Sequence, residues 1–225
     1  LHYRLIYRKH KMDLIDEVKI INGVAKISIT IDNMGKVTLK HSKDVSKNAI
    51  ENFVENKRSW IQKKKEDKIN SLDKNTDILN YKSICIFDKD YKLTKTKRNR
   101  VEGNEIFFTT PKLLSTTIKK LAENEFKNRV TFYKNLIGVS PISYTLDNTR
   151  TRWGVCTSKK EIKINFRAVL LPKELFDYVI IHELCHLIQF NHSALYWQEV
   201  EKYCPKYKKY RQEIKSFSFL LEMFR

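Results

Sequence analysis

The stretch VIIHELCHLIQFNHS, residues 179–193, holds three of the six histidines of this 225-residue chain. Within it HELCH spans residues 182–186, and positions i and i+4 of an α-helix lie one above the other on the same face. A helix here therefore lets His182 and His186 hold one ion. Glu183 follows about 100° further round the helix, where its carboxylate can reach a water on that ion without binding the ion itself. The pattern predicts a zinc site with a catalytic base.

His192 can complete this site if the helix ends before it. A continuing helix would carry His192 about 240° away from the face that bears His186. Asn191 tolerates the left-handed conformation that ends many helices, and Ser193 is a good N-cap for a following helix. The turn would bring His192 back as a third ligand and leave a fourth position for water, as in catalytic zinc sites. A structural histidine pair bonded to backbone carbonyls is the alternative.

The same rules predict the elements on both sides of this stretch. Pro172 suits the start of the helix that carries the histidines, and the next helix should end before Pro205. The segment 142–171 predicts two or three strands. A long helix should run from Pro111 to a left-handed cap at Gly138. Strand-like runs precede it, and a last helical stretch closes the chain.

The N-terminal third has a different pattern. Residues 18–40 alternate apolar and polar side chains around two glycine-containing turns, which predicts antiparallel strands joined by tight turns. Ser46 can cap a following helix whose apolar side includes Trp60 and Ile61. The polar segment 67–76 lacks periodicity, and we expect it to be a linker or an exposed loop.

Two blocks of the chain resemble a known family. They are TRTRWGVCTSKKEIKINFRAVLL at 149–171 and VIIHELCHLIQFNHSALYW at 179–197, and they resemble the YgjP-like metallopeptidase domain family, also known as DUF45, of the zincin group. The histidine spacing is also similar to that of Spartan-type proteases, which act on DNA-protein crosslinks. Tyr196 stands where the family usually has Phe, and Val155 stands where it usually has Ser.

The resemblance implies a fold and an activity. The fold class is α+β, with a small N-terminal sheet plus helix over 1–75 and a zincin-like metallopeptidase domain over 76–225. The activity is that of a zinc metallopeptidase, which hydrolyses peptide bonds with a metal-bound water activated by Glu183. The expected cofactor is Zn2+, and the expected partner is a protein or peptide substrate.

A second group of residues is a candidate for substrate binding. Arg150, Arg152 and Trp153 lie just before a strand that leads toward the metal-site helix, and an extended peptide can bind as an added strand beside such an edge. The alternative places Trp153 in the core and the two arginines on the surface. Asn165 lies on a polar strand face, and we assign it to substrate binding or to support of the metal site.

The net charge of +18 makes DNA a possible partner. Basic clusters lie at 63–65, 95–100 and 206–211, although lysine tracts are commonly solvated surface. Aromatic residues that could stack on unpaired bases, or form a buried helix face, accompany the last cluster: Tyr203, Tyr207 and Tyr210.

The alternative function is therefore a nucleic-acid-binding module with a structural or vestigial zinc site. Glu183 favours the peptidase, because a structural site has no use for a base. No apolar run approaches the roughly 20 residues of a membrane helix. The four cysteines form no CxxC pair, so we expect free thiols and a cytoplasmic protein.

Overall fold

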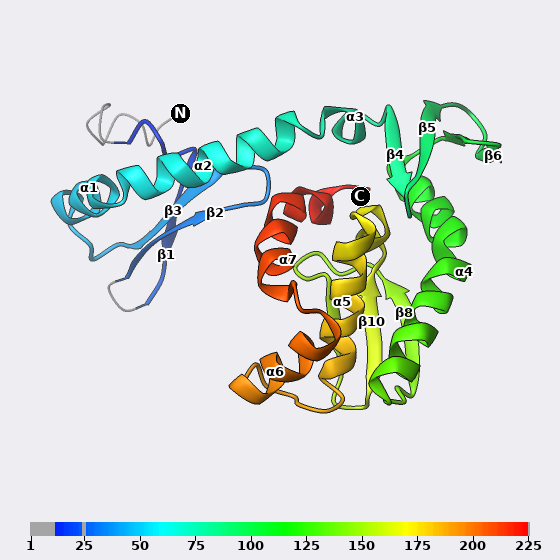
Figure 1. Cartoon of the computed structure of the whole chain (residues 1–225). Coiled ribbons are helices and arrows are strands. Elements are labelled where there is room, and N and C mark those ends of the chain that lie inside the picture. The colour runs from blue at the N-terminus through cyan, green and yellow to red at the C-terminus, as the bar shows by residue number, and fades with distance from the viewer. Residues whose placement is uncertain (1–11, 24–25, 225) are drawn as a thin grey trace. The chain divides into compact units, whose positions relative to one another are not determined.

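Figure 1 shows the computed structural model of the chain, which describes residues 12–23 and 26–224. Three separate sheets alternate with helices, so the predicted α+β class is confirmed. Contacts divide the chain into two compact units, Leu1–Asn75 and Thr76–Arg225. Within the described ranges, no helix combines the length and the apolar character needed to cross a membrane.

The first unit contains a three-stranded sheet in the order β1-β3-β2. β1 is Glu17–Ile21, β2 is Ile27–Ile31 and β3 is Val37–Ser42. β2 and β3 pair antiparallel, but β1 lies parallel to β3, so the prediction of successive antiparallel strands is wrong for β1. β3 takes the centre because Val37 and Leu39 are fully buried, whereas the side chains of the flanking strands are half-buried or exposed.

Helix α1, Lys47–Asn56, completes the core of this unit. It begins where the sequence predicts, because the Ser46 hydroxyl accepts a hydrogen bond from the Ala49 backbone N at 3.3 Å. The apolar face of α1 packs on the sheet in one cluster, whose buried members are Ile15, Val37, Leu39, Ile50, Val54 and Ile61.

Helix α2, Arg58–Asp73, corrects two expectations. The segment 67–76 is helical as far as Asp73, although it was predicted as a linker or loop. Good helix formers, namely arginine, glutamine, lysine and glutamate, make up most of residues 58–66, and the helix that they begin continues to Asp73 with few buried side chains. Trp60 is 45% exposed, and only its neighbour Ile61 enters the core, because adjacent positions point about 100° apart.

The second unit begins with the short helix α3, Thr76–Leu79, and a four-stranded sheet in the order β4-β5-β7-β6. Its strands are β4 Ser83–Ile86, β5 Lys89–Lys95, β6 Arg100–Glu102 and β7 Glu105–Phe108. The long helix α4 follows over Pro111–Ile137. Its predicted end is confirmed, because Gly138 has a left-handed φ of +76°.

A third sheet, β8-β10-β9, lies beside the helix that carries the histidines. β10 pairs parallel with β8 and antiparallel with β9, so β9 is an edge strand. A short 3-10 helix, η2, connects β10 to α5, and α5 contacts β9, β10 and α4. The bounds are β8 Ser143–Asp147, β9 Gly154–Cys156, β10 Glu161–Asn165, η2 Phe166–Leu170 and α5 Lys173–Cys185.

The C-terminal helices cover the remaining side of α5. They are α6 Ala194–Tyr203, α7 Tyr207–Glu213 and the 3-10 helix η3 Ile214–Glu222. Both α6 and α7 contact α5, and Figure 1 shows α5 between α7 and the strand β10. The metal-site helix is therefore enclosed by elements from both of its sides, and this packing sets the surroundings of its polar residues.

Candidate metal centre

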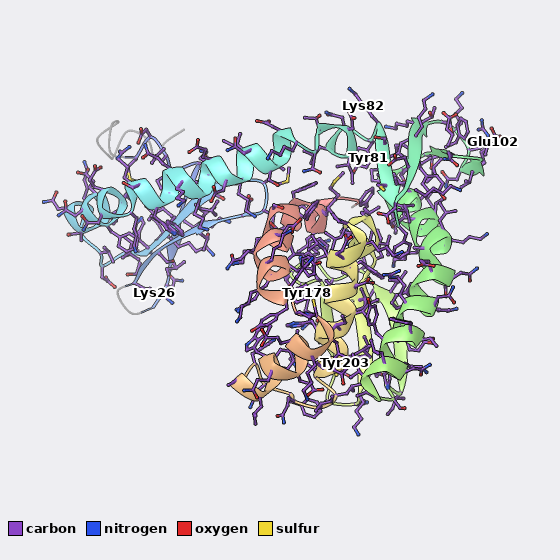
Figure 2. The ribbon with its side chains drawn as sticks, viewed as in Figure 1. Lys26, Tyr81, Lys82, Glu102, Tyr178 and Tyr203 are labelled. Atoms are coloured by element: carbon purple, nitrogen blue, oxygen red, sulfur yellow. The ribbon has the colours of Figure 1, made fainter. Side chains whose placement is uncertain are left out.

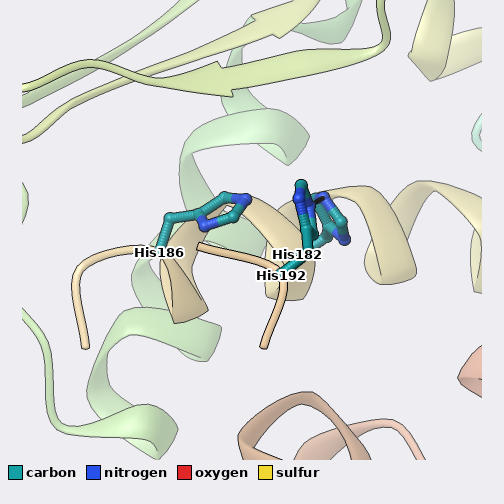
Figure 3. A group of neighbouring side chains, drawn as sticks. All are labelled: His182, His186 and His192. Carbon is teal, nitrogen blue, oxygen red and sulfur yellow. Dashed lines mark hydrogen bonds between the residues drawn. The ribbon is translucent and has the colours of Figure 1, made fainter. Parts of the chain in front are cut away.

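Three histidines come together at the C-terminal end of α5. His182 lies in the last turn of this helix, His186 is its C-cap residue, and His192 lies on the loop before α6. Figure 3 shows the His186 ring facing the other two rings across a gap. One ring nitrogen from each histidine lies within 4.8 Å of the others. The Nε2 atoms of His182 and His192 are 3.2 Å apart.

The surroundings keep two of these rings ready to bind a metal. His186 Nδ1 lies 3.1 Å from the carbonyl oxygen of Gln189, so Nδ1 donates its proton there and Nε2 keeps a free lone pair. Burial, with the charges of the neighbouring histidines and of Arg211, lowers the pKa of His182 to about 3. Burial also lowers the pKa of His186. Both rings are therefore neutral at pH 7, the form that binds metals.

The loop that returns the third histidine differs from its predicted form. Helix α5 already ends at Cys185, and Asn191 is not among the residues with positive φ, so the predicted left-handed Asn191 is wrong. Instead, its Oδ1 accepts a hydrogen bond from the Ser193 backbone N at 3.2 Å, which closes a turn through the side chain. The predicted cap at Ser193 is confirmed, because its hydroxyl accepts from the Tyr196 backbone N.

Two aromatic residues that the sequence did not point to hold the histidines in place. Tyr196 is fully buried, stacks on the His186 ring with centroids 4.5 Å apart, and donates its hydroxyl proton to the His182 carbonyl oxygen at 2.9 Å. Trp197 stacks on the His192 ring with centroids 5.5 Å apart. Both rings also contact the His182 ring, and Tyr196 contacts the His192 ring as well. Such contacts orient metal ligands and tune their affinity.

Glu183 lies next to the histidines but is not one of the converging ligands. Its side chain is buried, and burial raises its pKa to about 8. A backbone hydrogen bond from Cys156 and the charge of Arg152 act in the opposite direction and lower this pKa. β9 packs closely on this carboxyl. A Cβ atom built on Gly154 would lie 2.6 to 2.9 Å from three atoms of the Glu183 side chain. A side chain at position 154 would therefore displace the carboxyl.

One family model covers most of the chain. A model of the family described as YgjP-like, metallopeptidase domain, matches residues 25–217. The chain belongs to this family. The metallopeptidase zymogen of Pyrococcus abyssi abylysin, a solved structure, is 23% identical over 39% of this chain and 90% of its own, with a TM-score of 0.37. A search of curated proteins gives no match.

Membership of the YgjP-like metallopeptidase family implies a divalent metal, and the three histidines fit zinc. Zinc binds imidazole nitrogens at about 2.0–2.1 Å in tetrahedral geometry, which places two such nitrogens roughly 3.4 Å apart. The 3.2 Å between the Nε2 atoms of His182 and His192 is close to that value. Three imidazole ligands also leave one of the four positions open.

In this YgjP-like chain, the four residues assigned to substrate binding have two different environments. Arg150 and Arg152 are exposed and Trp153 is half-buried, all in the loop that leads into β9. Asn165 is fully buried, which favours the supporting role over a direct contact with substrate. Its Nδ2 donates to the carbonyl oxygens of Thr149 at 2.6 Å and Arg152 at 3.1 Å. Asn165 therefore holds the loop in place.

The basic clusters do not come together on one surface of the second unit. The cluster at 63–65 belongs to α2 in the first unit. The clusters at 95–100 and 206–211 both belong to the second unit, where Figure 1 shows β6 well apart from α7. A single surface formed by the last two is therefore excluded, and this arrangement gives no support to a DNA partner.

The tyrosines near the C-terminal cluster differ in how far they are buried. Tyr207 is buried and stacks on Trp197, with ring centroids 5.2 Å apart and an interplanar angle of 12°. Tyr210 contacts Tyr178 of α5, and Tyr203 is half-buried; Figure 2 labels Tyr178 and Tyr203 in the second unit. The interpretation of these tyrosines as a buried helix face is therefore confirmed for Tyr207, whereas Tyr203 and Tyr210 are half-buried.

Proposed function

We propose that this chain is a zinc-dependent endopeptidase. The observation that carries the proposal is the convergence of three histidine nitrogens beside a buried carboxyl, Glu183, that is not one of the ligands. A purely structural site would need no such carboxyl, and burying one is costly. Zinc, when bound by His182, His186 and His192, supplies a Lewis acid that polarises a peptide carbonyl and makes water more acidic.

Glu183 has the position and the environment of a general base. Its carboxylate can take a proton from the attacking water and pass the proton to the leaving amine. Burial raises its pKa toward neutral pH, which suits a group that first accepts and then returns a proton. The backbone of Cys156 bonds to this carboxyl, and Gly154 leaves it the space it occupies.

The edge strand β9 is where we propose that the substrate binds. β9 is the outer strand of its sheet, and its first residue, Gly154, touches the Glu183 side chain. An extended peptide that pairs with β9 would therefore pass beside the proposed base. The exposed Arg150 and Arg152 precede this strand and would lie along the same path.

Metal analysis and peptide hydrolysis with matched variants test the proposal. Protein purified without chelators should contain about one zinc per chain. Glu183→Gln should retain the zinc and lose about 100- to 10,000-fold in hydrolysis of a denatured protein substrate, because it removes only the base. Glu201→Gln, which replaces an exposed glutamate on α6, is the control and should change neither the zinc content nor the rate of hydrolysis.

Two outcomes would contradict this function. If Glu183→Gln loses as much zinc as a histidine variant, Glu183 is a ligand and the assignment of a base is wrong. If zinc-loaded wild-type protein cleaves no peptide bond in a proteome-derived peptide mixture, the proposed activity itself is wrong.

A further inference from the structure

Two arginines near the candidate metal centre lack the ion pairs that several other arginines of the described chain form. Several others form ion pairs with carboxylates: Arg58 with Asp13 and Glu55, Arg100 with Glu102, and Arg129 with Asp177. Arg152 and Arg211 are both exposed, and neither forms a salt bridge with a carboxylate among the residues that the structure describes. Two guanidinium groups therefore remain available at the site.

Arg211 lies on the side of the site formed by the C-terminal helices. It follows Tyr207 by four residues, so both side chains share one face of α7. The guanidinium carbon of Arg211 lies 4.7 Å from the centre of the Trp197 ring, and Trp197 in turn stacks on His192. The positive charge of Arg211 is also among the groups that lower the pKa of His182, after burial and the two neighbouring histidines.

Arg152 lies in the loop that enters β9, two residues before Gly154, which touches the Glu183 side chain. Asn165 and Thr149 hold its backbone carbonyl, so the position of the residue is fixed although its side chain is exposed. Its charge acts on Glu183, where it partly opposes the rise in pKa caused by burial. Around the axis of α5, Glu183 lies about 100° from His182 in one direction, and Tyr178 lies about 40° from it in the other. The charge of Arg211 also acts on Tyr178, where it opposes the rise in pKa caused by burial. The two arginines therefore reach the site from different elements, Arg152 from the loop before β9 and Arg211 from α7.

We propose that Arg152 and Arg211 make this site selective for peptides that carry a carboxylate close to the bond to be cleaved. This inference rests on the proposed peptidase function. A guanidinium without an internal partner binds a carboxylate through two parallel, charge-assisted hydrogen bonds. The carboxylate can come from an Asp or Glu side chain of the substrate or from its C-terminus, and both present the same group.

Binding to an inactive, zinc-loaded protein tests the selectivity without hydrolysis. The probes are amidated peptides of one apolar sequence flanked by Asp and Glu, by Asn and Gln, or by Lys, labelled with a neutral fluorophore, and the protein is Glu183→Gln. Fluorescence anisotropy should show that the acidic peptide binds at least about fivefold more tightly than the neutral one at low salt. A fourth peptide, neutral but with a free C-terminus, separates the two sources of the carboxylate.

Arginine variants show whether the preference belongs to this site. Arg152→Gln and Arg211→Gln, each made in the Glu183→Gln protein, should reduce the preference by about two- to fivefold. Arg98→Gln is the matched control, because Arg98 is also exposed but precedes β6, and Figure 2 shows Glu102 of that strand far from Tyr178. The control should keep the full preference.

The two proposals fail in different ways. Equal binding of the acidic and neutral peptides, or an equal loss of preference in Arg98→Gln, would overturn the selectivity and assign any attraction to the overall charge. Hydrolysis of the neutral peptide by the wild-type protein would then leave the peptidase function intact. A preserved, arginine-dependent preference without hydrolysis of any peptide would instead support carboxylate recognition and refute the peptidase.

Discussion

Helices α2 and α5 place their polar residues in opposite environments. In α2, Ile61 and Ser71 are the buried residues of sixteen, its acidic residues are exposed, and its lysines are exposed or half-buried. In α5, nine of thirteen residues are buried, and Glu183 is among them. An exposed lysine costs the fold almost nothing, whereas a buried carboxyl is costly unless it is paired. The polar residues of α5 therefore need an explanation that those of α2 do not.

The difference shows which sequence signals point to function. Charge density is highest in segments such as 63–65, yet these side chains are exposed or, like Lys65, paired with Asp16 on the surface. The functional signal is a small number of ionisable groups inside an apolar helix, because burial shifts their pKa values and fixes their geometry. A net charge of +18 is thus weaker evidence about activity than one glutamate in HELCH.

The largest expected effect comes from removing a ligand from the end of α5. His186→Ala should lower zinc affinity by more than about 100-fold, since removing even a hydrogen-bond partner of a ligand costs about 10- to 100-fold. Hydrolysis should be lost with the metal. Elemental analysis and competition with a chromogenic chelator measure the affinity. His41→Ala, which removes a buried histidine of the first unit, is the control. Full zinc content in His186→Ala would show that His186 is not a ligand.

The next effect concerns the contact between β9 and α5. Gly154 has an ordinary φ, so Gly154→Ala strains no backbone and acts only through its clash with Glu183. Displacing the carboxyl by about 1 Å should lower kcat about 100-fold while zinc content stays unchanged. Val155→Ala, on the same strand, is the control and should retain most of the activity. A Gly154→Ala protein with full activity would show that the position of Glu183 is not critical.

A smaller effect should appear in the pH dependence of the metal-free protein. The pKa of Glu183 is about 8 when folded, against an ordinary value of 4.5, so the folded state binds the proton more tightly. This contribution to stability is complete below pH 4.5 and is lost as pH rises through 8. Between pH 6.5 and 8 the free energy of unfolding should fall by about 2 kcal/mol. His182 opposes this fall by about 0.4 kcal/mol, because at pH 6.5 it is half protonated in the unfolded state and neutral in the folded state.

Chelator-treated wild type and Glu183→Gln can be compared by urea denaturation at pH 6.5 and 8. The glutamine variant cannot ionise at this position, so it should lack this part of the decline. An identical decline in both proteins would mean that Glu183 does not carry the effect.

The parts of the site that were predicted correctly are those that depend on local chemistry. Ser46 and Ser193 cap helices through hydrogen bonds to backbone groups three residues away. The spacing of His182 and His186 follows from helix geometry alone. The return of His192 was also expected, although Asn191 achieves it through its side chain and not through a left-handed backbone.

The parts that were missed depend on contacts between distant segments. β1 pairs with β3 because β3 has the most buried side chains, which no pattern within β1 reveals. Asn165 looks like a cleft residue on an alternating strand, but the chain at Thr149–Arg152 folds over it and takes its hydrogen bonds. The stacking of Trp197 on Tyr207 likewise joins two helices whose orientation the sequence does not encode locally.

The smallest expected effects lie in α2, where substitutions of three neighbouring lysines should change the free energy of unfolding by amounts that differ by fractions of a kcal/mol. Lys63→Gln should change the free energy of unfolding by less than about 0.5 kcal/mol, because its side chain is exposed. Lys64→Gln should be neutral or slightly stabilising. Burial lowers the pKa of Lys68, and the positive charge of Lys64 lowers it further, so removing the charge of Lys64 relieves a repulsion between the two lysines. Lys65→Gln should cost about 0.2–1 kcal/mol, since it breaks the 3.1 Å ion pair with Asp16.

Urea denaturation of the three variants gives this order, and each should keep full zinc content and hydrolysis. A loss of zinc or activity in Lys63→Gln or Lys64→Gln, with stability unchanged, would show that the charge of α2 serves the metal site, and the contrast between the two helices would be wrong.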